Sequence, residues 1–533
     1  MTTAPPLRVV IADKMAPGGL ELLTRTPGIE VVNCAGKPRG ELEAALERAH
    51  ALIVRSETRV TADLLNRAPQ LRVIARAGIG VDTIDVHAAT RRGIAVMNAP
   101  GANTVSAAEH AMGLLLSLVR HIPWAADSMR RGEWDRKRYE GTELRGKTLG
   151  IVGLGRIGGH VASIARAFGM VVIGHDPYLS PERAAELQVK TMPLDQMLAA
   201  ADVVTLHLAL TDQTRHLINQ QRLALMKPTA ILVNTARGEL VDEAALAAAI
   251  TEKRIAGAAA DVFTQEPLPP DSPLRQLDRV ILTPHLAAST SEAQDRVSQE
   301  ISAAVRNALI DGDLSTAVNI PGIGADVLRR GAPLLDLARR LGRLALALVD
   351  GPVIGVEIAY GGKDEAVARP ALIAALEGLL AGLGETGVSL VNAPLLAEER
   401  GIRLTRRTSA AEPGFEASLE VGVETAKGRT RVAGAIVGTT HGRVIRIDDY
   451  SVDIVPAGWV LVIRNRDVPG VIGRVGTILG EAGVNVASWH QGRTASGGEA
   501  LAAIAVDQSV ANGVRTLIEQ LPDILQVRIV DFG

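Results

Sequence analysis

Residues 8–100 alternate short apolar, β-branched runs with helical patterns, and this alternation constrains the fold more than any other feature. The runs RVVIAD, IEVVNC, ALIVRS, LRVIARAG and IAVMNAP are typical of strands, and GGLELLTRT, GELEAALERAH and TADLLNRAP are typical of helices between them. Such alternation predicts a parallel sheet covered by helices on both faces. A second array of this kind runs from KTLGIVG to VILTPHLA, after the long helical pattern VSAAEHAMGLLLSLVR. The sequence therefore predicts an α/β fold with two Rossmann-like, doubly wound domains and a ligand cleft between them.

The rest of the chain adds two smaller units. The helical segment SEAQDRVSQEISAAVRNALIDGD can return to the first array, and the following stretch reads only as an α+β domain. The last eighty residues read strand, helix, strand, strand, helix, strand, which is the pattern of a ferredoxin-like unit. We therefore expect four domains, a discontinuous outer domain of residues 1–103 and 289–319, a dinucleotide domain of 104–288, an intervening domain of 320–456 and a C-terminal domain of 457–533.

Composition excludes several classes of function. Lys+Arg number 57 against 59 Asp+Glu, for a net charge of -2, and aromatic residues are 2% of the chain, so neither a basic surface nor a stacking surface for nucleic acid is expected. A single cysteine, Cys34, excludes an internal disulfide, and neither paired cysteines nor HExxH offers a zinc site. No signal peptide and no apolar run of about 18 residues is evident. We expect a cytoplasmic protein without metal, nucleic acid or membrane partners.

The strongest local motif is GLGRIG, in which Gly153, Gly155 and Gly158 follow an apolar strand and open a helix. Residues without a Cβ allow a tight turn and close approach of a pyrophosphate to the helix N-terminus. Asp176 ends the next strand, 18 residues past Gly158, where a carboxylate binds ribose hydroxyls and repels a 2′-phosphate. The motif predicts NAD as cofactor, with Arg156 either near the pyrophosphate or solvated.

A bound nicotinamide implies hydride transfer, which needs a base for the hydroxyl proton and a cation for a substrate carboxylate. His285, in TPHLAAST, and His207, at the end of DVVTLHL, are both candidates for the base, and spacing alone favours His285 only modestly. His110, on an apolar helix face, reads better as a satisfied, partly buried histidine. Glu266, in DVFTQEP, can orient a histidine, and Arg237, in NTARG, can bind a carboxylate through two hydrogen bonds.

The ordered motifs GLGRIG, HDP, VNTARGELVDE, DVFTQEP and TPHLAAST, with RAGIGVDTID and NAPGANTVSAAEHA before them, resemble the D-2-hydroxyacid dehydrogenases over most of residues 8–320. The resemblance implies that Arg237 binds the substrate carboxylate, that His285 is the acid/base and that Glu266 pairs with it. His207 then becomes a neighbour of the cofactor loop.

The resemblance also assigns the remaining contacts of the cleft. It implies cofactor contacts at Ile79, Gly153, Gly155, Arg156, Ile157, Gly158, Asp176, Leu208, Thr235, Ala236, Asp261 and Ala287. It places substrate contacts in the outer domain and beside it, at Arg55, Ser56, Arg76, Gly78 and Asn103, together with Arg237. A further basic cluster, Arg136, Lys137 and Arg138, is expected either as solvated charge or as a third set of cations facing a phosphate.

The C-terminal unit, with DVPGVIGRVGTILGEAGVNVASW, resembles an ACT domain, a small-molecule sensor. Over the whole chain this arrangement resembles the long-form branch of the family, whose members oxidise 3-phospho-D-glycerate to 3-phosphohydroxypyruvate with NAD at the entry to L-serine biosynthesis. The resemblance implies a homotetramer, an intervening domain that binds substrate allosterically, and serine held by Asp467 and Asn485. Asn465 stands where some members carry a tyrosine, which bears on the strength of feedback.

Three alternatives stay open on the sequence alone. One is another dehydrogenase of the family, acting on glycerate, hydroxypyruvate or a longer 2-hydroxy acid. A second is a dinucleotide-sensing binding protein built on the same fold, and a pure amino-acid sensor is the third. For the ACT-like unit, a role in oligomerisation alone competes with effector binding.

Overall fold

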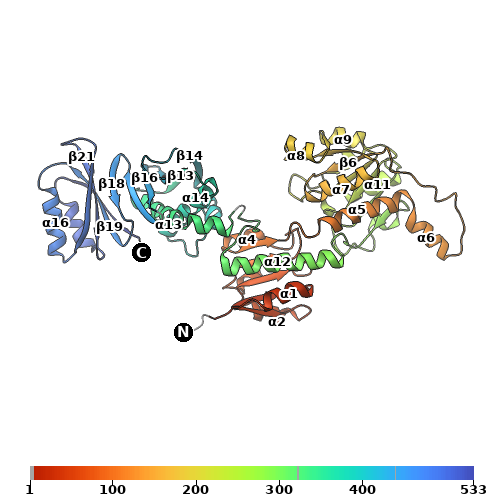
Figure 1. Ribbon diagram of the computed structural model, residues 1–533, viewed down its shortest axis with the longest axis horizontal. Coiled ribbons are helices and arrows are strands. Elements are labelled where there is room, and N and C mark those ends of the chain that lie inside the picture. The colour runs from red at the N-terminus through yellow and green to blue at the C-terminus, as the bar shows by residue number, and fades with distance from the viewer. Residues whose placement is uncertain (1–4, 321–322, 439, 533) are drawn as a thin grey trace.

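The computed structural model describes residues 5–320, 323–438 and 440–532, and it contains four sheets arranged along an elongated molecule (Figure 1). Two sheets are entirely parallel, the third is mixed and the fourth is antiparallel. The predicted α/β fold with two Rossmann-like domains is confirmed. Each of the four predicted domain ranges encloses one of the sheets, while the limits themselves stay a prediction.

The outer domain is built on a five-stranded parallel sheet in the order β2-β1-β3-β4-β5. Its strands are β1 (Leu7–Ile11), β2 (Ile29–Asn33), β3 (Ala51–Val54), β4 (Val73–Arg76) and β5 (Ala95–Asn98), and its helices are α1 (Pro17–Thr24), α2 (Arg39–Leu46), α3 (Ala62–Asn66) and α4 (Val86–Arg91). All four residues of β3 are fully buried, as expected for a parallel sheet covered on both faces.

Helix α12 (Ser291–Asp311) returns from the dinucleotide domain to the outer sheet, as its sequence led us to expect (Figure 1). It packs against α1, where the Ser298 hydroxyl donates to the Ala16 carbonyl at 2.9 Å. A Cβ on Gly19 would collide with Ser298, so this close approach requires glycine. The outer domain is therefore assembled from two separate stretches of chain.

The dinucleotide domain contains seven parallel strands in the order β12-β11-β10-β9-β6-β7-β8, joined to the outer domain by α5 (Thr104–Val119). The strands are β6 (Thr148–Val152), β7 (Val171–His175), β8 (Lys190–Thr191), β9 (Val203–Leu206), β10 (Ile231–Asn234), β11 (Gly257–Ala260) and β12 (Val280–Leu282). The helices are α6 (Ile122–Arg130), α7 (Arg156–Ala167), α8 (Pro181–Glu186), α9 (Leu194–Ala200), α10 (Gln220–Leu223) and α11 (Glu243–Thr251), with 3-10 turns at Gly238–Leu240 and Pro273–Gln276. The strand order reverses between β6 and β9, and ligands of such sheets bind at this point, beyond the carboxyl ends of the strands.

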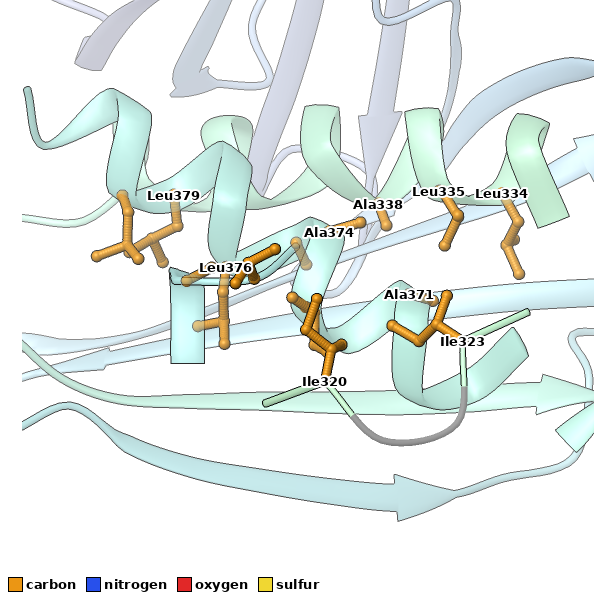
Figure 2. Close-up of a cluster of buried hydrophobic side chains, with 14 of the residues drawn as sticks. Ile320, Ile323, Leu334, Leu335, Ala338, Ala371, Ala374, Leu376 and Leu379 are labelled. Carbon is orange, nitrogen blue, oxygen red and sulfur yellow. The ribbon is translucent and has the colours of Figure 1, made fainter. Parts of the chain in front are cut away.

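The intervening domain has a six-stranded mixed sheet in the order β14-β13-β15-β16-β17-β18. Its elements are α13 (Ala325–Ala347), β13 (Val353–Gly362), α14 (Glu365–Gly382), α15 (Ala393–Glu399), β14 (Arg403–Thr408), β15 (Ala417–Thr425), β16 (Gly428–Val437), β17 (His441–Ile447) and β18 (Tyr450–Ile454). Figure 2 shows Ile320 and Ile323, just before α13, pointing at the apolar side chains of α13 and α14. The connection from the outer domain is therefore anchored in this core.

The C-terminal domain has the ferredoxin-like order predicted for it, with strands arranged β20-β21-β19-β22. Its elements are β19 (Trp459–Arg466), α16 (Val471–Glu481), β20 (Val486–Arg493), β21 (Glu499–Val506), α17 (Asn512–Glu519) and β22 (Ile524–Asp531). One face of the sheet packs on α16 and α17, and side chains of the other face, such as Val460 and Val530, belong to the core of the intervening domain. An ion pair of 2.6 Å between Arg528 and Asp350 adds to this contact.

In the ranges that the structure describes, no helix is both long and apolar enough to cross a membrane.

Candidate active site

The glycine-rich loop lies between β6 and α7, at the point where the strand order reverses. Gly153 has φ 88, and a Cβ there would collide with the His207 carbonyl oxygen, while a Cβ on Gly158 would collide with the Gly153 carbonyl oxygen. Both positions therefore require glycine. At Gly155, the residue before α7, no atom beyond its own chain neighbours lies within 4 Å of an added Cβ. This open space beside a helix N-terminus is where a pyrophosphate would bind.

Asp176 follows β7 and is held against the same loop. Its Oδ2 accepts a hydrogen bond from the Leu154 backbone N–H at 2.9 Å, and its Oδ1 accepts from the Tyr178 N–H at 3.0 Å. These bonds fix the carboxylate beside the loop, in the position that the motif predicts for a ribose-binding acid.

The other predicted cofactor contacts lie at the carboxyl-terminal edges of the strands, in the outer sheet and in the dinucleotide sheet. Arg156 and Ile157 begin α7, and the rest follow the carboxyl ends of strands, at Ile79, Leu208, Thr235, Ala236, Asp261 and Ala287. Because the strands of one parallel sheet end at a common edge, the fold places the dinucleotide-domain residues at the same edge, whereas Ile79 follows a strand of the outer sheet. Thr235 Oγ1 and Asn103 Oδ1 are buried without a hydrogen-bond partner among the described residues. Such buried polar atoms usually have a partner, and a bound cofactor or substrate would supply one.

His285 and Glu266 form a hydrogen-bonded pair, as the motifs predict. The distance from His285 Nδ1 to Glu266 Oε2 is 2.8 Å, and Glu266 Oε1 accepts from the Phe263 backbone N–H at 3.1 Å. Burial raises the pKa of Glu266, but the hydrogen bond and charge of His285 outweigh it and hold that pKa below its ordinary value. With Nδ1 engaged, His285 Nε2 is the ring nitrogen left to exchange a proton with a substrate.

The loop that carries His285 is anchored by Asp261, which is 0% exposed. The carboxylate accepts from the backbone N–H groups of Leu286 at 2.8 Å and Ala287 at 2.9 Å, and from the Thr283 hydroxyl at 2.6 Å. Burial raises the pKa of Asp261, but these bonds and one from His110 together hold it below its ordinary value. The sequence interpretation treated Asp261 only as a cofactor contact and missed this anchoring role, which depends on contacts between separate strands.

The two other histidine candidates are also explained by their contacts. His110 Nε2 lies 3.2 Å from Asp261 Oδ1 and 3.3 Å from Thr283 Oγ1, so it is a satisfied, partly buried histidine. His207 Nε2 lies 2.9 Å from Thr205 Oγ1, and burial lowers the pKa of His207 to about 4. His207 is therefore neutral at pH 7 and lies beside the cofactor loop.

Arg237 reaches from the dinucleotide domain to the outer domain. Its Nε donates to Asp82 Oδ2 at 2.9 Å and its Nη1 donates to the Ala236 carbonyl at 2.6 Å. Its Nη2 approaches Gly80 so closely that a Cβ there would collide with it. Among the described residues Nη2 has no hydrogen-bond partner. The guanidinium therefore lies between the two domains with one donor group available.

Arg76, at the end of β4, is largely buried, and within the described ranges its Nε has no hydrogen-bond partner. Burial lowers the pKa of Arg76 to about 10; the charges of Arg237 and Arg55 contribute to that decrease, and those of Asp82 and Asp13 oppose it. The side chain packs over Gly78, where a Cβ would collide with it. Arg55, Arg76 and Arg237, from three separate loops, therefore lie close enough for their charges to interact.

Of the remaining predicted substrate contacts, Arg55 and Ser56 lie in the loop after β3, whereas the basic cluster after α6 lies elsewhere. The Arg55 backbone N–H donates to the buried Asp13 carboxylate at 2.5 Å, which fixes the loop after β3 and leaves Ser56 exposed. The basic cluster Arg136, Lys137 and Arg138 is exposed, in the segment after α6 that projects away from the sheets (Figure 1). Within one chain this cluster does not face the cleft.

The predicted effector residues bond to neighbours in their own domain. Asp467 Oδ2 accepts from Arg493 Nη1 at 3.3 Å, and Asn485 Nδ2 donates to Asp507 Oδ2 at 2.6 Å. Asn465, which is 1% exposed, donates to the Arg466 carbonyl at 2.7 Å. An effector at this site would therefore have to compete with Arg493 and Asp507.

Models of three known domains match the chain. Residues 112–287 match the D-isomer specific 2-hydroxyacid dehydrogenase NAD binding domain, 331–448 match the D-3-phosphoglycerate dehydrogenase intervening domain, and 459–523 match the ACT domain. The first match establishes the NAD-binding domain of a dehydrogenase. Among the described residues, no group of three His, Cys, Asp or Glu could hold a metal ion.

Similar proteins extend the match to nearly the whole chain. The D-3-phosphoglycerate dehydrogenase of Mycobacterium tuberculosis is 43% identical over 528 residues, which cover 98% of this chain and 99% of that protein. That of Methanocaldococcus jannaschii is 40% identical over 531 residues, 98% of this chain and 100% of that protein. The D-lactate dehydrogenase structure from Aquifex aeolicus, complexed with NAD and lactic acid, is 30% identical with a TM-score of 0.52, and covers 58% of this chain and 97% of that one. The chain is a member of the D-3-phosphoglycerate dehydrogenase family, within the D-isomer specific 2-hydroxyacid dehydrogenases.

Proposed function

We propose that the protein oxidises 3-phospho-D-glycerate to 3-phosphohydroxypyruvate with NAD, the first step of L-serine biosynthesis. The observation that carries this proposal is the positive charge in the cleft. Arg76 is largely buried close to Arg237 and Arg55, and its Nε has no hydrogen-bond partner among the described residues. Asp82 and Asp13 offset part of this positive charge, but Asp82 is already paired with Arg237 at 2.9 Å, so the site favours a ligand with more negative charge than one carboxylate provides. A phosphate and a carboxylate on one three-carbon substrate meet that requirement.

The residues of the dinucleotide domain fit NAD. The open face at Gly155, the fixed carboxylate of Asp176 and the unpartnered hydroxyl of Thr235 are the features that a pyrophosphate, a ribose and a further polar group would use. When bound, NAD supplies the hydride acceptor. The protein's own part is to hold the substrate and to move a proton.

Proton transfer follows from the His285–Glu266 pair. Arg237, through its available Nη2, binds the substrate carboxylate and so orients the C2 hydroxyl in the cleft. His285 Nε2 takes the hydroxyl proton as hydride leaves C2, and Glu266, 2.8 Å from Nδ1, stabilises the imidazolium that forms. In the reverse direction the same nitrogen returns the proton.

The test compares NAD reduction with 3-phospho-D-glycerate and with D-glycerate. We expect a strong preference for the phosphorylated acid, and Arg76→Gln should lower kcat/KM for it by about 100-fold, because a charge-assisted contact to phosphate is lost. The same variant should change kcat/KM for D-glycerate much less. Comparable rates of the unmodified enzyme on both acids would favour a glycerate or hydroxypyruvate dehydrogenase instead.

We also propose that the enzyme is a cytoplasmic homotetramer inhibited by L-serine at the ACT domain, with Asp467 and Asn485 as the effector ligands. The type of the C-terminal domain supports this proposal. Asp467→Asn should raise the serine concentration needed for inhibition without changing kcat. If serine leaves the unmodified enzyme fully active, the domain has only an assembly role.

A further inference from the structure

A cavity of about 390 Å³ lies between the outer domain and the intervening domain, away from the catalytic cleft. From the outer domain it is lined by His50, Arg72 and Arg92, and from the intervening domain by Gly387 and Ser389. His50 and Arg72 directly precede β3 and β4, whereas the arginines of the catalytic cleft, Arg55 and Arg76, follow or end these strands. The cavity is therefore at the opposite edge of the same sheet.

The lining of this cavity is basic. It contains two arginines and a histidine, and no acidic residue. Among the described residues neither Arg72 nor Arg92 has a carboxylate partner, and the one side-chain bond of Arg92 is to the neutral Asn66, at 2.8 Å. Other arginines that bridge elements pair with carboxylates, as Arg8 does with Glu30 and Arg222 does with Asp195. The two cavity arginines therefore remain available to an anion.

His50 adds a donor of defined orientation. Its Nδ1 accepts a hydrogen bond from the Arg8 backbone N–H at 3.0 Å, so the ring proton is on Nε2, which is then free to donate to an anion. Burial, together with Arg72 and Arg8, lowers the pKa of His50 and keeps the free ring neutral. A neutral donor beside two guanidinium groups suits a phosphate, which accepts hydrogen bonds through several oxygens.

The cavity lies at a direct contact between the two domains. Asn392, 2% exposed, donates to the carbonyls of Gly387 at 3.0 Å and of Arg91, in the outer domain, at 3.3 Å. A Cβ on Gly93, which has φ 74, would lie 2.9 Å from Ser389 Oγ. The loop before β5 and the loop before α15 are thus packed together, and an anion bound beside them would contact both domains.

We propose that this cavity is a second anion site, for a phosphate or a small phosphate ester, and that its ligand ties the outer domain to the intervening domain. The hydrogen-bond donors of this site are His50, Arg72 and Arg92 of the outer domain, and residues 387–389 of the intervening domain form its other wall. His50 and Arg55 flank the same four-residue strand and lie about 16 Å apart along it, so the new site and the catalytic cleft are joined by a short rigid element.

The test is calorimetric titration of the full-length protein with inorganic phosphate at constant ionic strength. We compare the unmodified protein, the double variant Arg72→Gln/Arg92→Gln, Arg76→Gln in the catalytic cleft, and Arg369→Gln. Arg369 is exposed on α14 and has no ion-pair partner in the part of the chain that the structure describes, so it serves as the matched control. Because all removed arginines of the cavity are exposed, the double variant should fold normally.

We expect the double variant to bind phosphate at this site about tenfold or more weakly, while Arg76→Gln and Arg369→Gln retain the binding event. In the unmodified protein, phosphate should also slow amide hydrogen exchange in the 88–94 and 385–392 segments, and it should not do so in the double variant. If the double variant keeps the isotherm of the unmodified protein, or if only Arg76→Gln loses binding, phosphate binds elsewhere and the proposal is wrong.

Discussion

Replacing Glu266 with glutamine tests how the protein controls its acid/base group. Glu266 uses both carboxylate oxygens, one for Phe263 N–H at 3.1 Å and one for His285 Nδ1 at 2.8 Å. Glutamine has a single oxygen, so it can serve only one of these two donors. If the oxygen stays with Phe263, the amide NH2 turns toward His285, and the ring takes the tautomer that cannot accept a proton at Nε2.

The magnitude follows from the charge that is lost. A unit charge about 4 Å from the imidazolium stabilises it by about 1 kcal/mol in bulk water and by about 4 kcal/mol near a protein surface. Because the side chains of His285 and Glu266 are 44% and 38% exposed, we take about 2 kcal/mol, which is about 30-fold in rate. The unfavourable tautomer adds to this loss, so kcat should fall between about 30-fold and about 1000-fold.

The assay is steady-state NAD reduction at saturating 3-phospho-D-glycerate, with KM measured in parallel. Glu266 acts through His285 and not on the substrate, so KM should change little. The matched control is Glu243→Gln, since Glu243 Oε1 accepts from the Thr264 N–H of the same loop at 2.6 Å without contacting His285. A fall of less than about threefold for Glu266→Gln, or equal effects of the two variants, would refute this reasoning.

Three further predictions follow from the cleft and its supports. Arg237→Ala should lower kcat/KM by about 100-fold in the same assay, since the substrate carboxylate loses its cation, and an unchanged KM would contradict that role. Asp261→Asn should lower the free energy of unfolding by about 3 kcal/mol in urea melts at pH 7, because a buried acceptor of four donors is altered. The folded-state pKa of Asp261 is below its ordinary value, so its stabilisation is complete above about pH 5 and is lost as the pH falls through that pKa. The free energies of unfolding of Asp261→Asn and of the unmodified protein should therefore become more similar as the pH falls. A difference that stays constant with pH would contradict this role of the carboxylate. Gly153→Ala should weaken NADH binding by about tenfold or more in fluorescence titrations, because its Cβ collides with the His207 carbonyl; normal affinity would mean that the loop rearranges freely.

Much of the fold could be predicted because it depends on local patterns. The alternation of strands and helices, the glycine spacing before α7 and the β-α-β-β-α-β order at the C-terminus each reflect residues close together in the chain. Parallel strands end at one edge, so the fold class alone indicated that the loops after β6, β9, β10 and β12 meet. Spacing alone left His285 and His207 nearly equal as candidates for the catalytic base. The structure distinguishes them by their hydrogen-bond partners, Glu266 for His285 and Thr205 for His207, and by the burial that lowers the pKa of His207.

The sequence by itself determined the α/β architecture, the dinucleotide loop and the residue types of the catalytic group, because glycine spacing and hydrophobic periodicity act over a few residues. Only the tertiary structure decided which charges are paired. Arg237 pairs with Asp82 across the cleft, and Arg72 and Arg92 line a cavity between domains. Arg76 is largely buried, and no described residue is a hydrogen-bond partner of its Nε. Whether the charge of an arginine is neutralised depends on groups contributed by distant segments, and the sequence around the arginine does not identify those groups.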